Sequence, residues 1–168
     1  GDDLTGRMIN KIKVRIHEII EKAPEGDKLS RIFDVFIISL IVLNVTAVIL
    51  ETVDPLYAKY PAFFINFELF SVAVFSLEYV LRLWTCNLDS NFRYPVKGRI
   101  SFAFTPMAII DLLAVLPFYL AAIFPVDLRF IRILRLFRIL RVLKIARYSE
   151  SIRNIASAIT RKKEEIFI

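Results

Sequence analysis

The sequence contains few of the residues from which catalytic and metal sites are usually built. Its only cysteine is Cys86 and its only histidine is His17. A single cysteine excludes an internal disulfide and a thiolate metal cluster. With a single histidine, we expect neither a histidine-based metal site nor a Ser-His-Asp triad. We therefore expect no cofactor, no bound metal and no enzymatic activity.

Glycine is also scarce, with four residues in a chain of 168 and none after Gly98. Hydrophobic residues, by contrast, make up 57% of the chain, which is typical of a small helical membrane domain rather than a soluble one. A net charge of +6 on a soluble surface would suggest a nucleic-acid partner. Here seven of the 23 lysines and arginines lie inside one apolar run, so we expect a membrane and no nucleic acid.

That run places a basic residue at every third position between residues 129 and 147, with apolar residues between. Charge at membrane depth is costly, so such residues are rare and usually functional. The spacing winds the cations slowly around an α-helix and would align them on one face of a 3₁₀-helix. In both cases, sliding along the axis brings each cation to the place that its predecessor left. The seven cations are Arg129, Arg132, Arg135, Arg138, Arg141, Lys144 and Arg147.

Four apolar segments predict an all-α membrane protein with an antiparallel four-helix transmembrane bundle. Each segment contains enough residues to cross about 30 Å of hydrocarbon. We expect Pro106 and Pro117 to bend the third segment, and Pro117 to divide it. We also expect Thr52 to Tyr60 and Asn87 to Gly98 to form loops. The predicted spans are residues 30–51, 61–84, 100–124 and 128–148, within a four-helix domain of residues 29–148.

The two ends of the chain are amphipathic. Residues 4–22, within a leading unit of residues 1–28, predict an amphipathic helix on the membrane surface, in contact with anionic lipid head groups. Residues 149–168 predict a linker with a second apolar stripe. Lysine and arginine concentrate at both ends and in the Asn87–Gly98 loop, so we expect these parts to be cytoplasmic in a multi-pass cell-membrane protein. Because the chain does not begin with Met and shows no signal peptide, we expect it to be a segment of a longer protein.

Buried cations need acidic partners, and the other spans contain few of them. Glu51 and Glu68 predict an outer acidic station, and Glu78 and Asp111 predict an inner one. Phe75 lies between Glu68 and Glu78 on roughly the same helix face, and we interpret it as a plug between the two stations. Two further polar residues have simpler interpretations: Arg82 as the partner of Glu78 at i+4, and Asn44 as an interhelical hydrogen-bonding residue.

Three motifs carry a family resemblance: Phe67-Glu68, Phe75 and Leu77-Glu78 before Arg82; Ile110-Asp111 before Pro117; and the basic row ending at Ser149. Together they resemble the voltage-sensor domain of voltage-gated cation channels, most closely potassium channels, over about residues 30–160. The resemblance implies that Arg132, Arg135, Arg138 and Arg141 are the main gating charges, with Arg129 an extra outer position and Lys144 and Arg147 toward the inside. It also implies a charge-transfer centre formed by Phe75, Glu78 and Asp111.

The same resemblance implies partners. Residues 149–163 would link the sensor to a pore domain, and the full-length protein would be a homotetramer. The glycine-rich selectivity filter of such pores is absent from these 168 residues, since no glycine follows Gly98.

Three alternatives stay open. A stand-alone voltage-gated proton channel would be expected to carry an acid midway along the first span and a Trp in the basic row; here Asn44 and only Phe and aliphatic residues are found. A voltage-sensing phosphatase would need a Cys-plus-Arg phosphate loop, which these residues lack. A membrane module whose arginines bind lipid phosphate is the third. Charge movement under applied voltage would separate it from a sensor, and proton current in liposomes would identify the first.

Overall fold

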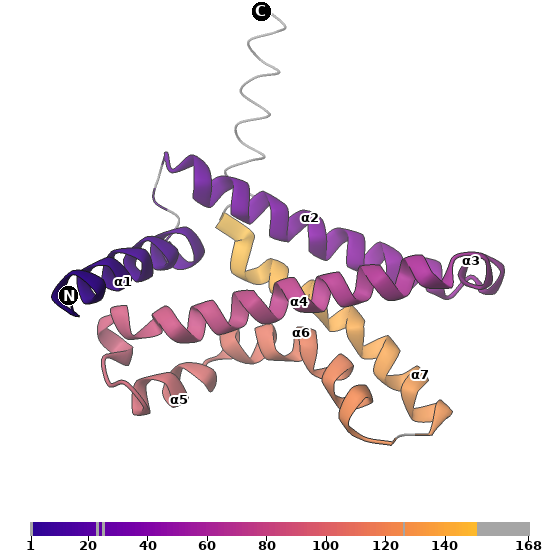
Figure 1. The fold of residues 1–168 in the computed structure, drawn as a ribbon. Helices are drawn as coiled ribbons and strands as arrows, with labels where there is room; N and C mark the ends of the chain where they lie inside the picture. Colours follow the sequence, from indigo (N-terminus) through magenta and orange to yellow (C-terminus); the bar gives the residue numbers. More distant parts are fainter. Residues whose placement is uncertain (1, 23, 25, 126, 151–168) are drawn as a thin grey trace, which may run out of the picture.

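A computed structural model describes residues 2–22, 24, 26–125 and 127–150, and all regular structure in these residues is helical (Figure 1). The prediction of an all-α protein is therefore confirmed. The elements are α1 (Asp2–His17), the π-helix η1 (Glu18–Lys22), α2 (Lys28–Glu51), α3 (Asp54–Lys59), α4 (Pro61–Thr85), the 3₁₀-turns η2 (Cys86–Leu88) and η3 (Ser90–Phe92), α5 (Lys97–Ala103), α6 (Pro106–Ile123), α7 (Leu128–Phe137) and the 3₁₀-helix η4 (Arg138–Tyr148).

The long helices pack side by side. In Figure 1, α2 and α4 run in opposite directions and are joined at one end by α3. The 3₁₀-helix η4 packs mainly against α2 and α6, and α6 also packs against α4. Among the described residues, three helices are long and apolar enough to cross a membrane: Lys28–Glu51, Pro61–Leu88 and Pro106–Ile123.

Local sequence signals explain where the helices begin. Asp27 precedes α2, and its side chain accepts a hydrogen bond from the backbone N–H of Leu29 at 3.2 Å. Thr105 caps α6 in the same way, through the N–H of Ala108, and Pro106 follows at the first helical position. A proline there costs no hydrogen bond, because the first N–H groups of a helix have no partner within it.

The structure corrects three predicted boundaries. The segment expected to be a loop after Thr52 contains α3, which begins at Asp54 with Pro55 in its first turn. The span predicted over residues 100–124 is two helices, α5 and α6, because Thr105 and Pro106 end one helix and start the next. Pro117 does not divide α6, which continues through it to Ile123. A proline removes one backbone hydrogen bond, which packed neighbours can compensate.

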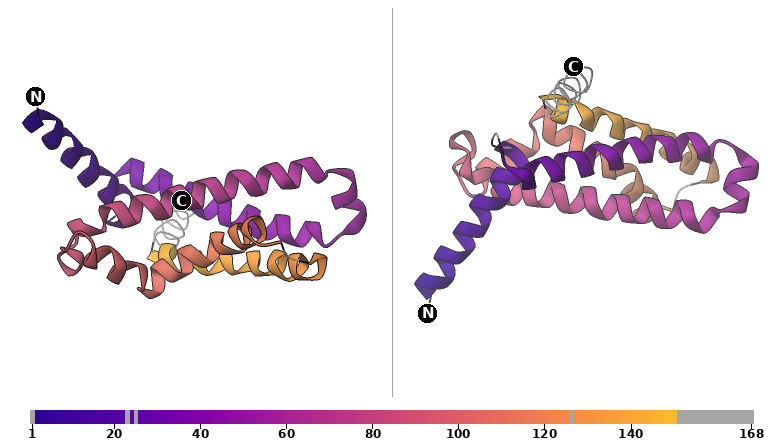
Figure 2. Two further views of the ribbon diagram at one scale, coloured as in Figure 1. Left: turned by 60° about the horizontal axis from the view of Figure 1, so that its bottom comes forward. Right: turned by 90° about the horizontal axis from the view of Figure 1, so that it is seen from above.

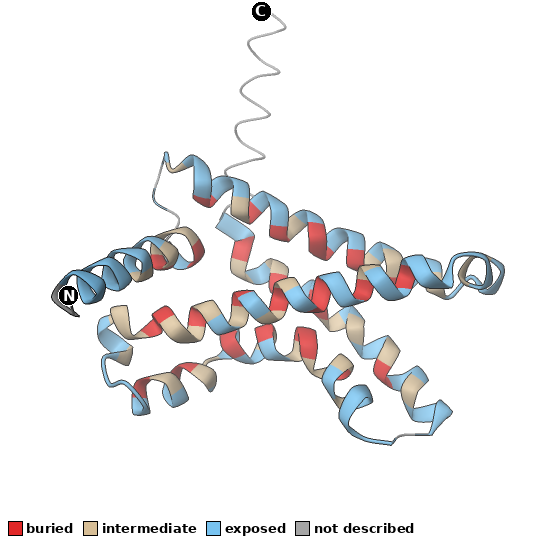
Figure 3. Ribbon diagram, in the orientation of Figure 1, coloured by how far each residue is buried: buried red, intermediate tan, exposed pale blue. Residues whose placement is uncertain are grey.

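The distribution of polar and apolar side chains is the reverse of that in a soluble domain. Buried residues lie on the facing sides of the helices, as the red segments in Figure 3 show, and many of them are polar or charged. Large apolar side chains point outward along the same helices. A surface of this kind is stable in lipid rather than in water. The exposed apolar residues include Ile32, Val42 and Ile49 on α2, Phe63, Leu69 and Leu77 on α4, and Ile109 and Ile123 on α6.

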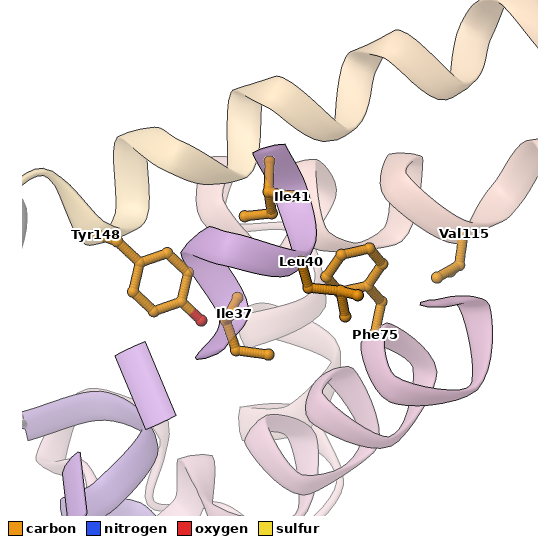
Figure 4. Packing of buried hydrophobic residues seen from close by; sticks show 6 residues of the cluster. All are labelled: Ile37, Leu40, Ile41, Phe75, Val115 and Tyr148. Atoms are coloured by element: carbon orange, nitrogen blue, oxygen red, sulfur yellow. The ribbon is translucent and has the colours of Figure 1, made fainter. Parts of the chain in front are cut away.

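Four helices contribute to one apolar cluster at the centre. Phe75 from α4 is fully buried there, with Val115 from α6 and Tyr148 from η4. Figure 4 shows these side chains approaching those of α2. The cluster forms the apolar background against which the charged side chains are placed. Its α2 members are Ile37, Leu40 and Ile41.

The leading helix α1 projects away from the other helices in both views of Figure 2. The chain then turns back through η1, which contacts both α2 and α4. The predicted leading helix of residues 4–22 is therefore an α-helix followed by a π-helical turn. Of the linker predicted over residues 149–168, only Ser149 and Glu150 lie within the described residues; the apolar stripe and the cations predicted beyond them do not.

Candidate functional site

The basic row changes helical geometry along its length. It begins as an α-helix in α7 and continues without interruption as the 3₁₀-helix η4, which is 11 residues long. Runs of 3₁₀-helix longer than about four residues are uncommon and often mark a functional hinge or strain. With about three residues per turn, every third side chain returns to the same face. The cations placed on this face are Arg138, Arg141, Lys144 and Arg147.

The predicted outer acids, Glu51 and Glu68, contact cations in the N-terminal half of the row. Arg138 lies 3.4 Å from the carboxylate of Glu51, at the end of α2, and 3.4 Å from that of Glu68 on α4. Arg135, one step earlier, lies 3.7 Å from Glu51 and over the ring of Tyr57. Glu51 and Glu68, which are 17 positions apart in the sequence, therefore share one cation, Arg138.

Arg141 is the most completely coordinated cation of the row. Its two terminal nitrogens donate to both oxygens of Glu68, at 2.9 and 2.7 Å, in a bidentate pair. It also donates to the side-chain oxygen of Asn44 and, at 2.8 Å, to the backbone carbonyl of Ala114. Ala114 is three residues before Pro117, on the same helix α6.

The inner acids contact the next two cations. The ammonium of Lys144 lies 2.9 Å from Glu78 on α4 and 2.9 Å from Asp111 on α6. Arg147 lies 2.7 Å from the other oxygen of Asp111. The two inner acids are thus held by a buried cluster of cations rather than left free. Within the described part of the chain, no group of three or more His, Cys, Asp and Glu side chains could hold a metal ion.

The ring of Phe75 lies against both groups of ion pairs. The centroid of the ring is 5.8 Å from the guanidinium carbon of Arg141 and 4.9 Å from the ammonium of Lys144. Both distances are within the range of a cation–π contact. The structure thus places Phe75 where the row passes from the outer acid Glu68 to the inner acids.

Burial along the row is deepest beside that ring. The side chain of Arg135 is 36% exposed and that of Arg138 is 19% exposed. Arg141 and Lys144 are fully buried, and Arg147 is 11% exposed. Only two of these five cations are therefore out of contact with solvent. The dry part of the path is about one three-residue step long, roughly 6 Å at the rise of a 3₁₀-helix.

Two predicted members of the row lie outside this network. Arg129 and Arg132 are exposed on α7, and among the described residues neither pairs with an acid. Because α7 is an α-helix, each three-residue step rotates a side chain by about 60° away from the line of its successor. Arg129 and Arg132 consequently do not face the same acids as the η4 cations.

The structure also brings in residues that the sequence interpretation gave a smaller role or none. Arg82 pairs with Glu78 at 2.7 Å, as its i+4 spacing suggested, and also with Glu21 of η1 at 2.8 Å. Glu21 lies 3.2 Å from Arg147 as well. The Tyr148 hydroxyl donates to Glu78 and accepts from Arg82. Glu21 carried no sequence signal, since its partners are 61 and 126 residues away.

Asn44 forms a hydrogen bond to a neighbouring helix and also contacts the basic row. Its amide nitrogen donates to the Ser71 hydroxyl on α4 at 2.9 Å and to the carbonyl of Leu40 at 2.7 Å. Its carbonyl oxygen is the acceptor for Arg141. An interhelical hydrogen bond therefore orients the amide so that its oxygen faces the basic row.

Comparison with known proteins identifies the family. A family model described as "Ion transport protein" matches residues 30–167, which is most of the chain and runs from the third residue of α2 through η4. The chain belongs to the ion transport protein family. Together with the three long apolar helices among the described residues, this identifies a membrane protein of the ion-channel class rather than an enzyme.

Individual relatives agree with the family. The "Putative potassium channel protein RPA4233" of Rhodopseudomonas palustris is 30% identical over 152 residues, which cover 89% of this chain and 36% of that protein. The "Potassium voltage-gated channel subfamily KQT member 1" proteins of Felis catus and Mus musculus are 32% and 31% identical over 62% of this chain. The matched segments are 18% and 15% of those two proteins. The chain thus spans little more than a third of the bacterial relative and less than a fifth of the two mammalian ones.

Proposed function

We propose that this chain is the voltage sensor of a voltage-gated, potassium-type channel. In this proposal α2, α4, α6 and the α7–η4 helix are the four spans of an antiparallel bundle, and the cations of the fourth span are the gating charges. The observation that carries the proposal is the buried pair Arg141 and Lys144. Each is matched to acids on other helices, and the ring of Phe75 lies against both.

The arrangement suits a cation row that changes partners. If the fourth span slides inward by three residues, Arg141 reaches the place of Lys144, and Lys144 reaches that of Arg147. In a 3₁₀-helix this exchange requires a translation of about 6 Å and almost no rotation. Every acid would keep a cation after the step, so a charged side chain need not lie unpaired in lipid.

The energy available from the membrane is sufficient. Each elementary charge that crosses the full potential gains about 2.3 kcal/mol per 100 mV. Three charges would gain about 7 kcal/mol, and reversing a two-state equilibrium from 1:99 to 99:1 takes about 5.5 kcal/mol. A short dry segment makes this coupling efficient, because most of the voltage then falls across the one step beside Phe75.

The proposal also includes orientation and partners. Both termini and the Asn87–Gly98 loop are cytoplasmic, following the concentration of lysine and arginine there. Residues 149–163 lead to a pore domain of the full-length protein, which is a homotetramer, and α1 lies on anionic lipid. Depolarisation moves the fourth span outward, and the linker transmits this movement to the pore.

Gating currents of the full-length protein under voltage clamp test the proposal. Arg141→Gln should reduce the total charge moved by about one elementary charge per chain, and Arg135→Gln should also reduce it. The matched control is Arg93→Gln, which removes an exposed arginine outside the row. Phe75→Ala should shift the charge–voltage curve. Unchanged total charge in Arg141→Gln would remove Arg141 from the gating charges, and an unmoved Phe75→Ala curve would remove the plug.

A further inference from the structure

Tyr148 is the last residue of η4, and it is a buried, uncharged side chain in contact with the buried charges of Glu78 and Arg82. Its side chain is 4% exposed. The hydroxyl donates to Glu78 Oε1 at 2.5 Å and accepts from Arg82 Nη2 at 2.8 Å, so it bridges two charged groups of α4. Figure 4 shows the ring beside Ile37 of α2, within the apolar cluster.

When the basic row moves inward by one three-residue step, the residue that replaces Tyr148 differs from it in chemistry, whereas each cation is replaced by another cation. The place of Tyr148 is then taken by Ile145, which already packs against the apolar cluster. An isoleucine can fill the apolar part of this place, but it can neither donate to Glu78 nor accept from Arg82. The hydrogen bonds of Tyr148 therefore belong to the observed position alone.

We propose that Tyr148 is a positioning residue, whose hydroxyl favours the observed position of the fourth span over the position one step further inward. This inference rests on the proposed voltage-sensing function and assigns to it a residue outside the basic row. Because the cations exchange places nearly symmetrically, a small asymmetric contact has a large effect on which position is populated. The hydroxyl makes that contact with two α4 residues that are themselves almost fully buried, Glu78 and Arg82.

The test is the charge–voltage curve of Tyr148→Phe in the full-length protein. This change removes one oxygen atom and keeps the ring in the cluster. A hydrogen bond to a charged group is strong enough that its loss should lower the equilibrium constant for the final outward step about tenfold. If that step moves one elementary charge, the curve should shift by about 60 mV toward depolarised potentials, with the total charge unchanged.

The matched control is Tyr119→Phe. Its hydroxyl bonds to the Ser76 hydroxyl at 2.8 Å, and both residues lie on helices that do not move in the proposal, α6 and α4. Its curve should coincide with that of the wild type. The proposal is overturned if the Tyr148→Phe curve also coincides with the wild type while the wild type moves charge, a result that leaves the sensor function intact. It is equally overturned if Tyr148→Phe loses total charge or if the control shifts as far. Absence of any voltage-dependent charge in the wild type would overturn both proposals.

Discussion

Individual side chains in this protein have unequal importance because their partners differ in burial. Glu78 and Glu51 are both acids with two cationic neighbours. The partners of Glu78, Lys144 and Arg82, have side chains that are 0% and 1% exposed. The partners of Glu51, by contrast, lie 3.4 and 3.7 Å away and can be hydrated. A charge that loses its partner in the buried cluster has no access to water.

Glu78→Gln should therefore destabilise the protein by about 3 kcal/mol, close to the cost of breaking a buried ion pair. Glu51→Gln should cost about 1 kcal/mol or less, as expected for a partly hydrated pair. Thermal unfolding of the purified variants in one detergent measures the difference. Equal losses of stability at the two positions would contradict the burial argument.

Single residues also show what the sequence could predict. The three-residue spacing of the cations is a local pattern, and so is the presence of acids in apolar segments, at Glu68, Glu78 and Asp111. Both could be predicted from the sequence. The contacts of Glu21 and Tyr148 could not, because they depend on how η1 and η4 dock against α4. Asn44 falls between these cases: an asparagine in an apolar helix predicts an interhelical hydrogen bond, but only the packed structure shows that its oxygen faces Arg141.

At the level of helices, two features determine which side chains meet in the site. The 3₁₀ geometry of η4 places its cations on one face, and the docking of η1 brings Glu21 to Arg82 and Arg147. The basic spacing was compatible with either helix type, and sequence periodicity alone could not choose between them. The breaks at Asp54-Pro55 and Thr105-Pro106 did carry readable signals, since both place a proline in the first turn of a helix. At Thr105-Pro106, predicting one long span gave too much weight to hydrophobicity and too little to capping. At Asp54-Pro55, predicting only a loop missed the short helix α3.

The docking of η1 makes a prediction for the leading segment. Glu21→Gln removes the acid that faces Arg82 and Arg147, so η1 should detach more readily from α4, at a cost of about 2 kcal/mol. Hydrogen exchange of the backbone amides of residues 18–22 should become faster. Glu18→Gln is the matched control, because Glu18 lies in the same turn but its side chain pairs with Arg15 of the leading helix. Similar acceleration in both variants would show that Glu21 has no special role.

At the scale of the whole molecule, the apolar exterior explains why the charged side chains are buried and paired in the interior. Lipid around α2, α4 and α6 leaves the interior as the place where charged side chains can find partners. The family match covers these helices together with α7 and η4, which carry the ion pairs between the basic row and the acids Glu51, Glu68, Glu78 and Asp111. We propose the orientation of the network relative to the two membrane faces from the positive-inside rule.

Cysteine accessibility tests that orientation, and the chain is well suited to it because Cys86 is its only cysteine and is buried. In a Cys86→Ala background, Lys59→Cys should react with a membrane-impermeant maleimide on intact cells. Arg93→Cys should react only after the membrane is permeabilised. The opposite pattern, or labelling of both positions from one side, would contradict the proposed topology.

The central claim is that the cation row moves past Phe75 when the potential changes. The most direct measurement is the rate at which Arg135→Cys, in the Cys86→Ala background of the full-length protein, reacts with an impermeant thiol reagent from outside. Arg135 is 36% exposed in the observed position, and two inward steps would carry it to the fully buried place of Arg141. We predict fast reaction at depolarised potentials and at least about tenfold slower reaction at hyperpolarised ones, a population change that the available electrical energy can produce. Equal rates at the two potentials would show that the row does not move.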